Sequence, residues 1–359
     1  MGFSLMNGFR RACWVSTEAL HSDPEKAVDK IARLGFEEVL SLVATVGGPL
    51  YPSSVRAQPP RFRGRDLVGR FIGEARRRGL GVHAWIVSLC YPNPEFEESR
   101  RNLYVVNKLG VSCVDRPPYV PHYKWLCPSR EEVRENLADL FLEVAERYEV
   151  DGLHFDYIRY PDALLPKALR SRYQGVPLED VVKPEFDYCY CESCRSKYLR
   201  ERGVDPRDIP FESELYEDWT KWRARQVTET VRYVLGKVKR AYPSMEVSAA
   251  VFPTPRIAFS YVRQDWPSWG LDYYHPMIYH KYYGEGVEWI GEAVRECASR
   301  GLPISAGIKV DFMDSYEELK RGFELALENG ARGITVFAYP MPKPELEEWV
   351  EKAFKELQP

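Results

Sequence analysis

The segment that decides the fold is VDGLHFDYIRYP, from Val150 to Pro161 of a 359-residue chain. It has the pattern of a buried strand that ends in acidic, aromatic and basic residues. Alternation along a strand places His154 and Asp156 on one face and Leu153 and Phe155 on the other. A carboxylate at the C-terminal end of a strand lies where α/β barrels keep their chemistry. We therefore expect Asp156 to be a functional residue.

Strand and helix patterns alternate along the whole chain, on both sides of this segment. The other expected strands cover residues 11–17, 36–44, 81–89, 247–252, 271–279, 304–310 and 333–338. Such alternation implies parallel strands joined by right-handed crossovers. Eight units predict a (β/α)8 TIM barrel that forms a single domain over residues 1–359. No Gly-rich phosphate loop follows the first strand, so we expect neither a doubly wound dinucleotide fold nor an organic cofactor.

Two regions interrupt the regular alternation. The long third loop, from Cys90 to Cys127, is rich in proline and is expected to contain a short helix from Glu95 to Lys108. Loops of this length usually serve a function. Ser129 is expected to cap the helix that precedes the central strand. The second region is an insertion over residues 161–212, which separates the central strand from a long amphipathic helix.

The composition excludes several classes of protein. With 50 basic and 53 acidic residues the net charge is −3, which argues against a nucleic-acid partner. No run of 18 apolar residues exists, so no membrane span is expected. Residues 1–11 lack the apolar core of a signal peptide. Eight cysteines without an export signal indicate reduced thiols or metal ligands, and hence a cytoplasmic location.

The insertion carries a C-x-C-x-x-C motif formed by Cys189, Cys191 and Cys194. Three thiolates so close in sequence suit zinc, which prefers four ligands in structural sites. Cys127 is the expected fourth ligand, and Cys113 is the alternative. A closed site of four thiolates would be structural, because no coordination position stays open for catalysis. Free or partly disulfide-bonded thiols are the other interpretation of the motif.

Glycoside hydrolysis normally uses two carboxyl groups, one of them an acid whose pKa is raised by burial. Asp156, which lies between two aromatic residues, suits this role, although it could also cap the next turn or pair with Arg159. Asp311, at the end of the seventh strand, is the candidate partner. Glu18 and Asp115 are further candidates. No glutamate ends the fifth strand, which argues against a pair of catalytic glutamates.

Residues on the strands or near their C-terminal ends are candidates for substrate binding, because aromatic faces stack on pyranose rings. Core packing is the alternative for any single aromatic residue. The candidates are Trp14, Trp85, His154, Tyr157, Arg159, Tyr279, His280, Lys309 and Tyr339. A catalytic metal bound by the strand histidines His83, His154 and His275 is an alternative, although no His-Glu-x-x-His motif is present.

The segments Lys124–Arg134 and Arg147–Pro161 resemble the glycosyl-hydrolase-like family ten proteins. The resemblance implies a (β/α)8 barrel and a sugar hydrolase, with Asp156 at the family's acidic position on the fourth strand. We therefore expect a glycoside hydrolase that cleaves O-glycosidic bonds of an oligosaccharide or polysaccharide. The alternatives are a non-catalytic carbohydrate-binding barrel and a metal-dependent hydrolase of another bond type.

The order of Cys127 and the C-x-C-x-x-C motif is also similar to the zinc cluster of family 42 β-galactosidases. That resemblance implies a structural zinc. It does not extend to the activity, because Asp156 and Tyr157 stand where that family carries Asn-Glu, and its strand-five nucleophile is missing.

Overall fold

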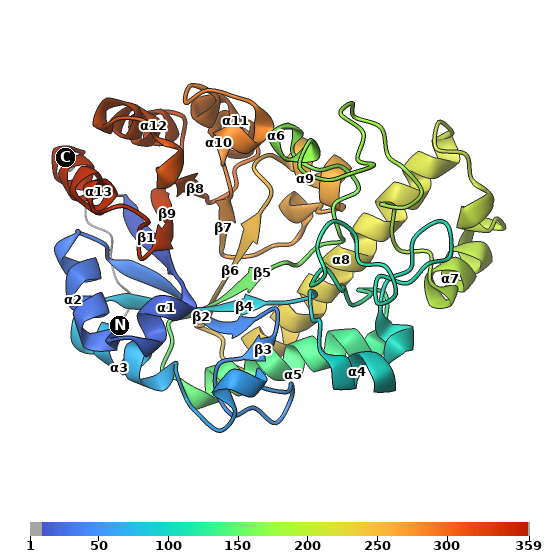
Figure 1. Ribbon diagram of the computed structural model, residues 1–359, viewed down its shortest axis with the longest axis horizontal. Coiled ribbons are helices and arrows are strands. Elements are labelled where there is room, and N and C mark those ends of the chain that lie inside the picture. The colour runs from blue at the N-terminus through green and yellow to red at the C-terminus, as the bar shows by residue number, and fades with distance from the viewer. Residues whose placement is uncertain (1–8, 358–359) are drawn as a thin grey trace.

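Eight parallel strands form a nearly closed barrel in the computed structural model, which describes residues 9–357 (Figure 1). The strand order is β7-β6-β5-β4-β2-β1-β9-β8. Parallel bridges from Tyr274 to Ile304 and from Met277 to Gly307 join β7 to β8. The predicted (β/α)8 fold is therefore confirmed. Most of the segment in which the sequence predicts no signal peptide lies outside the described residues.

The barrel strands are β1 (Arg10–Val15), β2 (Glu38–Thr45), β4 (Gly81–Val87), β5 (Gly152–Asp156), β6 (Glu246–Val251), β7 (Tyr273–Pro276), β8 (Ser305–Lys309) and β9 (Gly333–Tyr339), and β3 (Gly48–Pro49) forms a hairpin with β2. The α-helices are α1 (Thr17–His21), α2 (Pro24–Arg33), α3 (Gly69–Arg77), α4 (Pro94–Ser99), α5 (Glu131–Arg147), α6 (Lys167–Arg170), α7 (Glu192–Arg202), α8 (Glu214–Ala241), α9 (Pro255–Val262), α10 (His280–Tyr283), α11 (Trp289–Ala298), α12 (Tyr316–Glu328) and α13 (Pro344–Glu356). The 3₁₀ helices are η1 (Pro60–Phe62), η2 (Arg101–Leu103), η3 (Pro206–Asp208), η4 (Trp266–Ser268) and η5 (Val310–Phe312).

The helix expected from Glu95 to Lys108 is wrong in its second half. Helix α4 ends at Ser99 and η2 ends at Leu103. The chain then extends, and Tyr104 and Val106 form antiparallel bridges with later residues of the same loop. The run Tyr-Val-Val favours this extended form, because β-branched and aromatic side chains fit a pleated surface better than a helix.

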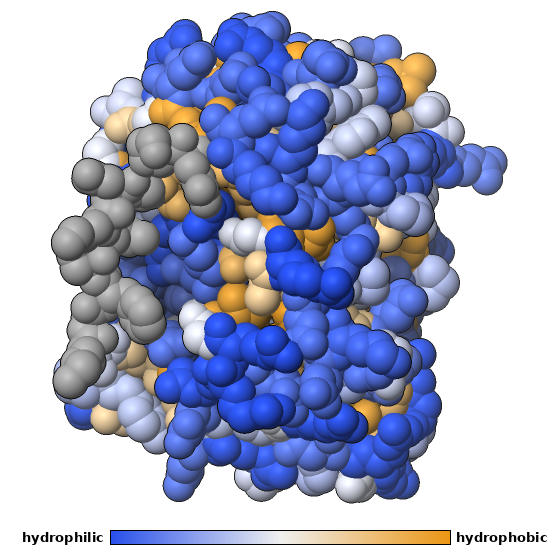
Figure 2. All heavy atoms as spheres, turned by 90° about the vertical axis from the view of Figure 1, so that its left-hand side faces the viewer, coloured by the Kyte–Doolittle hydropathy of each residue, from blue (hydrophilic) through white to orange (hydrophobic). Residues whose placement is uncertain are grey.

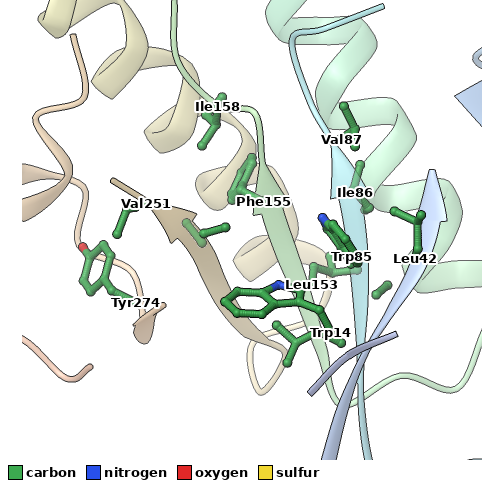
Figure 3. Close-up of a cluster of buried hydrophobic side chains, with 14 of the residues drawn as sticks. Trp14, Leu42, Trp85, Ile86, Val87, Leu153, Phe155, Ile158, Val251 and Tyr274 are labelled. Carbon is green, nitrogen blue, oxygen red and sulfur yellow. The ribbon is translucent and has the colours of Figure 1, made fainter. Parts of the chain in front are cut away.

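The alternation predicted for β5 is confirmed by the packing on its two faces. Phe155 points outward and packs on Phe141 of α5, with ring centroids 4.2 Å apart. His154 points into the barrel, where its Nε2 accepts a hydrogen bond of 3.1 Å from the indole N–H of Trp14. Its Nδ1 lies 2.9 Å from Ser248 Oγ on β6. Figure 3 shows Trp14 among the buried side chains of this region.

The insertion and α7 lie outside the ring of strands, on the right of Figure 1. A charge network attaches the insertion to the barrel. Asp187 is fully buried and accepts hydrogen bonds from Arg223 of α8 at 2.5 Å and from Arg263 at 3.1 Å. Tyr190 donates its hydroxyl to the other carboxylate oxygen at 2.5 Å. Every polar atom of this buried carboxylate is therefore satisfied, as burial of a charge requires.

The outer helices present polar residues to solvent. Figure 2 shows that the face on the left of Figure 1, where α2, α12 and α13 lie, is mostly hydrophilic. Within residues 9–357, no helix has both the length and the apolar character needed to cross a membrane.

The barrel interior leaves no room for a side chain at Gly307 of β8. A Cβ atom there would lie 2.7 Å from the carbonyl oxygen of Pro276 and 2.9 Å from the ring of Trp14. We expect Gly307→Ala to lower the free energy of unfolding by about 1–3 kcal/mol, the usual cost of overpacking. The matched control is Gly73→Ala in α3, where a Cβ meets nothing within 4 Å. Urea unfolding should show that variant unchanged or up to about 1 kcal/mol more stable.

Candidate active site

Asp156 ends β5, and two neutral N–H groups hold its carboxylate. Oδ2 accepts a hydrogen bond of 2.9 Å from the indole N–H of Trp85, on the adjacent strand β4. Oδ1 accepts one of 2.6 Å from the backbone N–H of Tyr157. Arg159 does not pair with Asp156, because its guanidinium bonds Asp162 at 2.9 Å instead. The side chain of Asp156 is thus fixed in direction without a bonded cation.

Burial controls the protonation of this carboxyl group. Asp156 is 6% exposed, and loss of solvent raises its pKa above the ordinary range. The hydrogen bonds from Trp85 and Tyr157, and the nearby charge of Arg159, lower the pKa and offset only part of the rise. A carboxyl group that keeps its proton closer to neutral pH has the property that a general acid requires.

Asp311 lies just beyond β8, in η5, where the sequence places the second candidate carboxylate. Its Oδ1 is 2.8 Å from the Nζ of Lys309, and its side chain is 27% exposed. The Lys309 ammonium also lies 5.2 Å from the ring centroid of Phe312 and 5.3 Å from that of Phe337. A charged pair held against aromatic rings therefore follows β8 at the C-terminal end of the barrel.

Tyr279 is a buried tyrosine whose hydroxyl senses the charge of both candidate carboxylates. It is buried after β7, its ring packs on Phe337 with centroids 5.4 Å apart, and its hydroxyl has no hydrogen-bond partner among the described residues. Burial raises the pKa of this hydroxyl well above its usual range, and the Asp156 carboxylate adds to the rise, as the Asp311 carboxylate does to a smaller extent. The hydroxyl is thus within electrostatic range of both acids.

An aromatic wall stands beside Asp156, and the long third loop supplies part of it. Trp125 of that loop stacks on Tyr157, with ring centroids 5.4 Å apart and planes at 28°. The guanidinium of Arg159 lies 4.7 Å above the Trp125 ring and 5.2 Å from that of Tyr157. The sequence predicted substrate-binding roles for Tyr157 and Arg159, which stay predictions, and did not single out their neighbours Trp125 and Asp162. Their signals were the position of Trp125 two residues before Cys127, and of Asp162 three residues after Arg159.

Several predicted substrate-binding residues have surroundings that do not include the Asp156 carboxylate. Trp14 and His154 are buried in the barrel, and both ring nitrogens of His154 are hydrogen-bonded. Tyr339 lines a surface hollow of about 380 Å³ formed with residues of α1 and α2. His280 begins α10 and packs edge-on against Phe312, with ring centroids 6.0 Å apart. Their roles in binding stay predictions.

The other candidate acids and the candidate metal-binding histidines have surroundings that do not form a catalytic site. Glu18 is exposed on α1, and Asp115 is exposed and pairs with Arg101. His275 bonds Thr335 at 2.8 Å inside the barrel. Within residues 9–357, the group of side chains positioned to hold a metal ion is the cysteine cluster rather than a set of histidines.

Four buried thiols meet at the junction of the insertion and the third loop. The Sγ atoms of Cys127, Cys189, Cys191 and Cys194 all lie within 4.8 Å of one another. Cys127 is 3.4 Å from Cys194 and 3.9 Å from Cys191. Zinc–sulfur bonds of 2.3 Å in a tetrahedron separate the sulfurs by about 3.8 Å. Cys113 lies elsewhere and accepts a hydrogen bond from the Trp125 N–H, so Cys127 is the fourth member of the cluster.

A nearly closed barrel with a buried acid at a strand's C-terminal end and aromatic residues beside it is an arrangement in which glycosidases carry out catalysis. The chain belongs to the glycosyl hydrolase-like 10 family, whose pattern matches residues 11–309.

Curated relatives of this chain include glycosyl hydrolases at low identity. The glycosyl hydrolase DigH of Escherichia coli O6:H1 is 27% identical over 239 residues, which cover 54% of this chain and 53% of the relative. DigH of E. coli K12 is 27% identical over 154 residues, 38% of this chain and 34% of the relative. The chain thus spans about half the length of the first relative, and about a third of the second.

Two structures share the fold at low identity. The α-L-fucosidase isoenzyme 2 of Paenibacillus thiaminolyticus has a TM-score of 0.68 at 15% identity, covering 98% of this chain and 49% of that one. The β-galactosidase of Rahnella sp. R3 has a TM-score of 0.69 at 12% identity, covering 99% of this chain and 56% of that one.

The hydrogen bond from Trp85 should lower the pKa of Asp156, because it stabilises the ionised carboxylate. We expect Trp85→Phe to raise this pKa further, because the ionised carboxylate loses one of its two hydrogen bonds. Carboxyl ¹³C NMR titration, with Asp156→Asn to assign the signal, would measure the change. Trp222→Phe is the matched control, since its indole N–H bonds Glu201 elsewhere. An unchanged or lowered pKa in Trp85→Phe would contradict the interpretation.

Proposed function

We propose that this chain is a glycoside hydrolase in which Asp156 is the general acid and Asp311 is the second catalytic carboxylate. The observation that carries the proposal is the buried Asp156, held by Trp85 and Tyr157 without a bonded cation. Its raised pKa suits proton donation. Tyr279, in electrostatic range of both acids, supports a reaction centre between them.

In the proposed reaction, Asp156 donates its proton to the leaving-group oxygen while the glycosidic bond breaks. Positive charge then develops on the anomeric carbon, and the carboxylate of Asp311 stabilises it. Water supplies the hydroxyl group that ends on the anomeric carbon and the proton that returns to Asp156. Lys309, which pairs with Asp311 at 2.8 Å, keeps the second carboxylate in place.

The proposed substrate is an oligosaccharide or polysaccharide. The ring of Tyr157, next to Asp156 in the chain, and that of Phe337, beside the Lys309 ammonium, are partly exposed, and such surfaces suit the C–H faces of pyranose rings. Arg159 and the free hydroxyl of Tyr279 are the proposed polar contacts to sugar hydroxyls. We propose that the reaction takes place in the cytoplasm, since none of the eight cysteines forms a disulfide, as expected of a reducing compartment.

We further propose that the cysteine cluster binds a structural zinc ion. Four soft sulfur donors, all buried and spaced as a tetrahedral site requires, suit zinc and leave no position open for substrate. The ion would hold the insertion against the third loop, and the reaction would proceed on the carboxylates alone.

Asp156→Asn should reduce kcat by about 10²–10⁴-fold, the usual contribution of a general acid. The loss should be large for glycosides with poor leaving groups and small for dinitrophenyl glycosides, whose leaving groups need little protonation. Asp311→Asn should reduce turnover of both kinds of substrate. The assay is a screen of aryl glycosides and oligosaccharides.

The matched control is Asp151→Asn, at the opposite end of the same strand, where the carboxylate pairs with exposed Arg76. It should keep wild-type turnover. Wild-type rates in Asp156→Asn would overturn the assignment of the acid. Sugar binding without turnover by the wild-type chain would favour a carbohydrate-binding barrel instead.

The purified chain should contain about one zinc ion, measured by elemental analysis. Cys191→Ser should lose it, because three ligands hold structural zinc poorly. Cys113→Ser is the control and should keep the ion, since this buried cysteine is outside the cluster. Equal zinc contents in the two variants would contradict the proposed ligand set.

A further inference from the structure

We propose that Arg56 is a positioning residue of the active site, which fixes the backbone N–H of Tyr157 that bonds the Asp156 carboxylate. It acts through the peptide group between Ser88 and Leu89. The inference rests on the proposed function, in which Asp156 is the acid. It assigns a role to a buried guanidinium in the loop after β3, which reaches the acid only through the backbone of other residues.

The residue that follows the acid has an unusual backbone conformation. Tyr157 has a φ of 50°, in the left-handed region that few residues other than glycine adopt. Such a conformation costs about 1–2 kcal/mol, and it persists only where the surrounding structure determines it. The backbone N–H of this residue is the one that bonds Oδ1 of Asp156 at 2.6 Å. The geometry of the acid therefore depends on the contacts that hold the turn at Tyr157.

Two hydrogen bonds from the segment after β4 hold this turn on both sides. The Ser88 N–H donates to the carbonyl oxygen of Asp156 at 2.8 Å, and the Leu89 N–H donates to that of Tyr157 at 3.3 Å. The Asp156 carbonyl belongs to the same peptide group as the N–H that bonds the carboxylate. Because hydrogen bonds in a chain polarise one another, the first bond strengthens the second. The position of Ser88 and Leu89 therefore sets the direction of the N–H that reaches Oδ1.

Arg56 holds the same segment through its side chain. Its Nη1 donates to the Ser88 carbonyl oxygen at 3.0 Å. This carbonyl is in the same peptide group as the Leu89 N–H that bonds Tyr157. The Nε of Arg56 donates to Oδ1 of Asn136, on α5, at 2.8 Å. The guanidinium thus ties the turn beside the acid to the helix that precedes the catalytic strand.

The charge of Arg56 is buried without a bonded carboxylate. The residue is 4% exposed, its Nη2 has no hydrogen-bond partner within residues 9–357, and the Tyr91 ring packs 4.9 Å from the guanidinium. Burial lowers its pKa to about 10, so the group stays charged at neutral pH. A buried charge without a counter-ion destabilises the folded state. The charge therefore indicates a function, and a charged donor holds the Ser88 carbonyl about twice as strongly as a neutral donor.

The test follows backbone N–H groups by NMR in the full-length chain without substrate. Arg56→Met removes the charge and both hydrogen bonds, and it should move the downfield amide resonance of Tyr157 upfield. Hydrogen exchange of Ser88 and Leu89 should rise about 10–100-fold, as expected for the loss of a hydrogen bond from a charged donor. Arg56→Lys keeps a charged donor and should restore most of the protection.

Asn136→Ala is the second variant, because it removes the acceptor that orients the guanidinium and leaves Arg56 in place. It should cause smaller changes in the same direction. The matched control is Arg170→Met, which removes another buried arginine, one that bonds the Leu165 carbonyl oxygen at 2.8 Å. This control should leave the Tyr157 resonance and the exchange of Ser88 unchanged.

Turnover gives a second measurement, on a substrate found in the glycoside screen. Arg56→Met should lower kcat about 10-fold, a part of the contribution of a general acid. It should change KM less than about twofold, because the acid is displaced while the groups that bind substrate stay in place. Arg170→Met should keep the wild-type kcat.

A wild-type Tyr157 resonance and wild-type exchange in both Arg56→Met and Asn136→Ala would overturn the positioning role. Equal changes in Arg170→Met would also overturn it, since they would report a general loosening of the fold. If Arg56→Met does not fold, Asn136→Ala decides the question. Wild-type turnover in Asp156→Asn would instead overturn the proposed function. The NMR measurements need no turnover, so the two failures are distinguishable.

Discussion

The register between β4 and β5 controls where the reactive carboxylate lies. Trp85 stands opposite His154, and Val87 stands opposite Asp156. A slip of one residue would turn every inward side chain of β5 toward the helices and would bury Asp156 against α5. The Trp85 N–H reaches across this pair of strands to the carboxylate, and the Ser88 N–H bonds the backbone carbonyl of Asp156 at 2.8 Å. The two contacts fix both the depth and the direction of the acid.

Asp156 and Asp162 lie on one short segment, and only Asp162 forms an ion pair with Arg159. Asp162 neutralises Arg159 at 2.9 Å, and three aromatic rings, those of Trp125, Tyr157 and Phe252, lie within 5.2 Å of the guanidinium. Asp156 is therefore left with neutral donors and a more distant positive charge. Had Arg159 paired with Asp156, the ion pair would have held that carboxyl group ionised and unsuited to donate a proton. The proposed acid thus depends on a neighbouring acid that takes no part in the reaction.

The sequence predicted the barrel and the cysteine cluster because both follow from local rules. Alternating periods define parallel strands, and the spacing of cysteines restricts the metal that could bring them together. The position of each inward-facing side chain along the barrel axis could not be predicted from the sequence pattern. Alternation shows that His154 and Asp156 share a face, but only the layering of all eight strands shows that His154 is enclosed by Trp14 and Ser248 whereas Asp156 is at the upper edge. The surroundings of Ser129 depended likewise on tertiary contacts, because the local pattern predicted a helix cap and the hydroxyl lies beside Cys194 instead.

The anchor of the insertion has a consequence for how this family can diversify. Asp187 is paired in the interior with Arg223 and Arg263, which belong to different elements of the barrel. An exchange of the insertion that omitted this aspartate would leave two buried guanidinium groups without a counter-charge. The free energy of unfolding would then fall by several kcal/mol. We therefore expect these three residues to be exchangeable only as a set, so that the insertion is a dependent part of the barrel rather than a transplantable module.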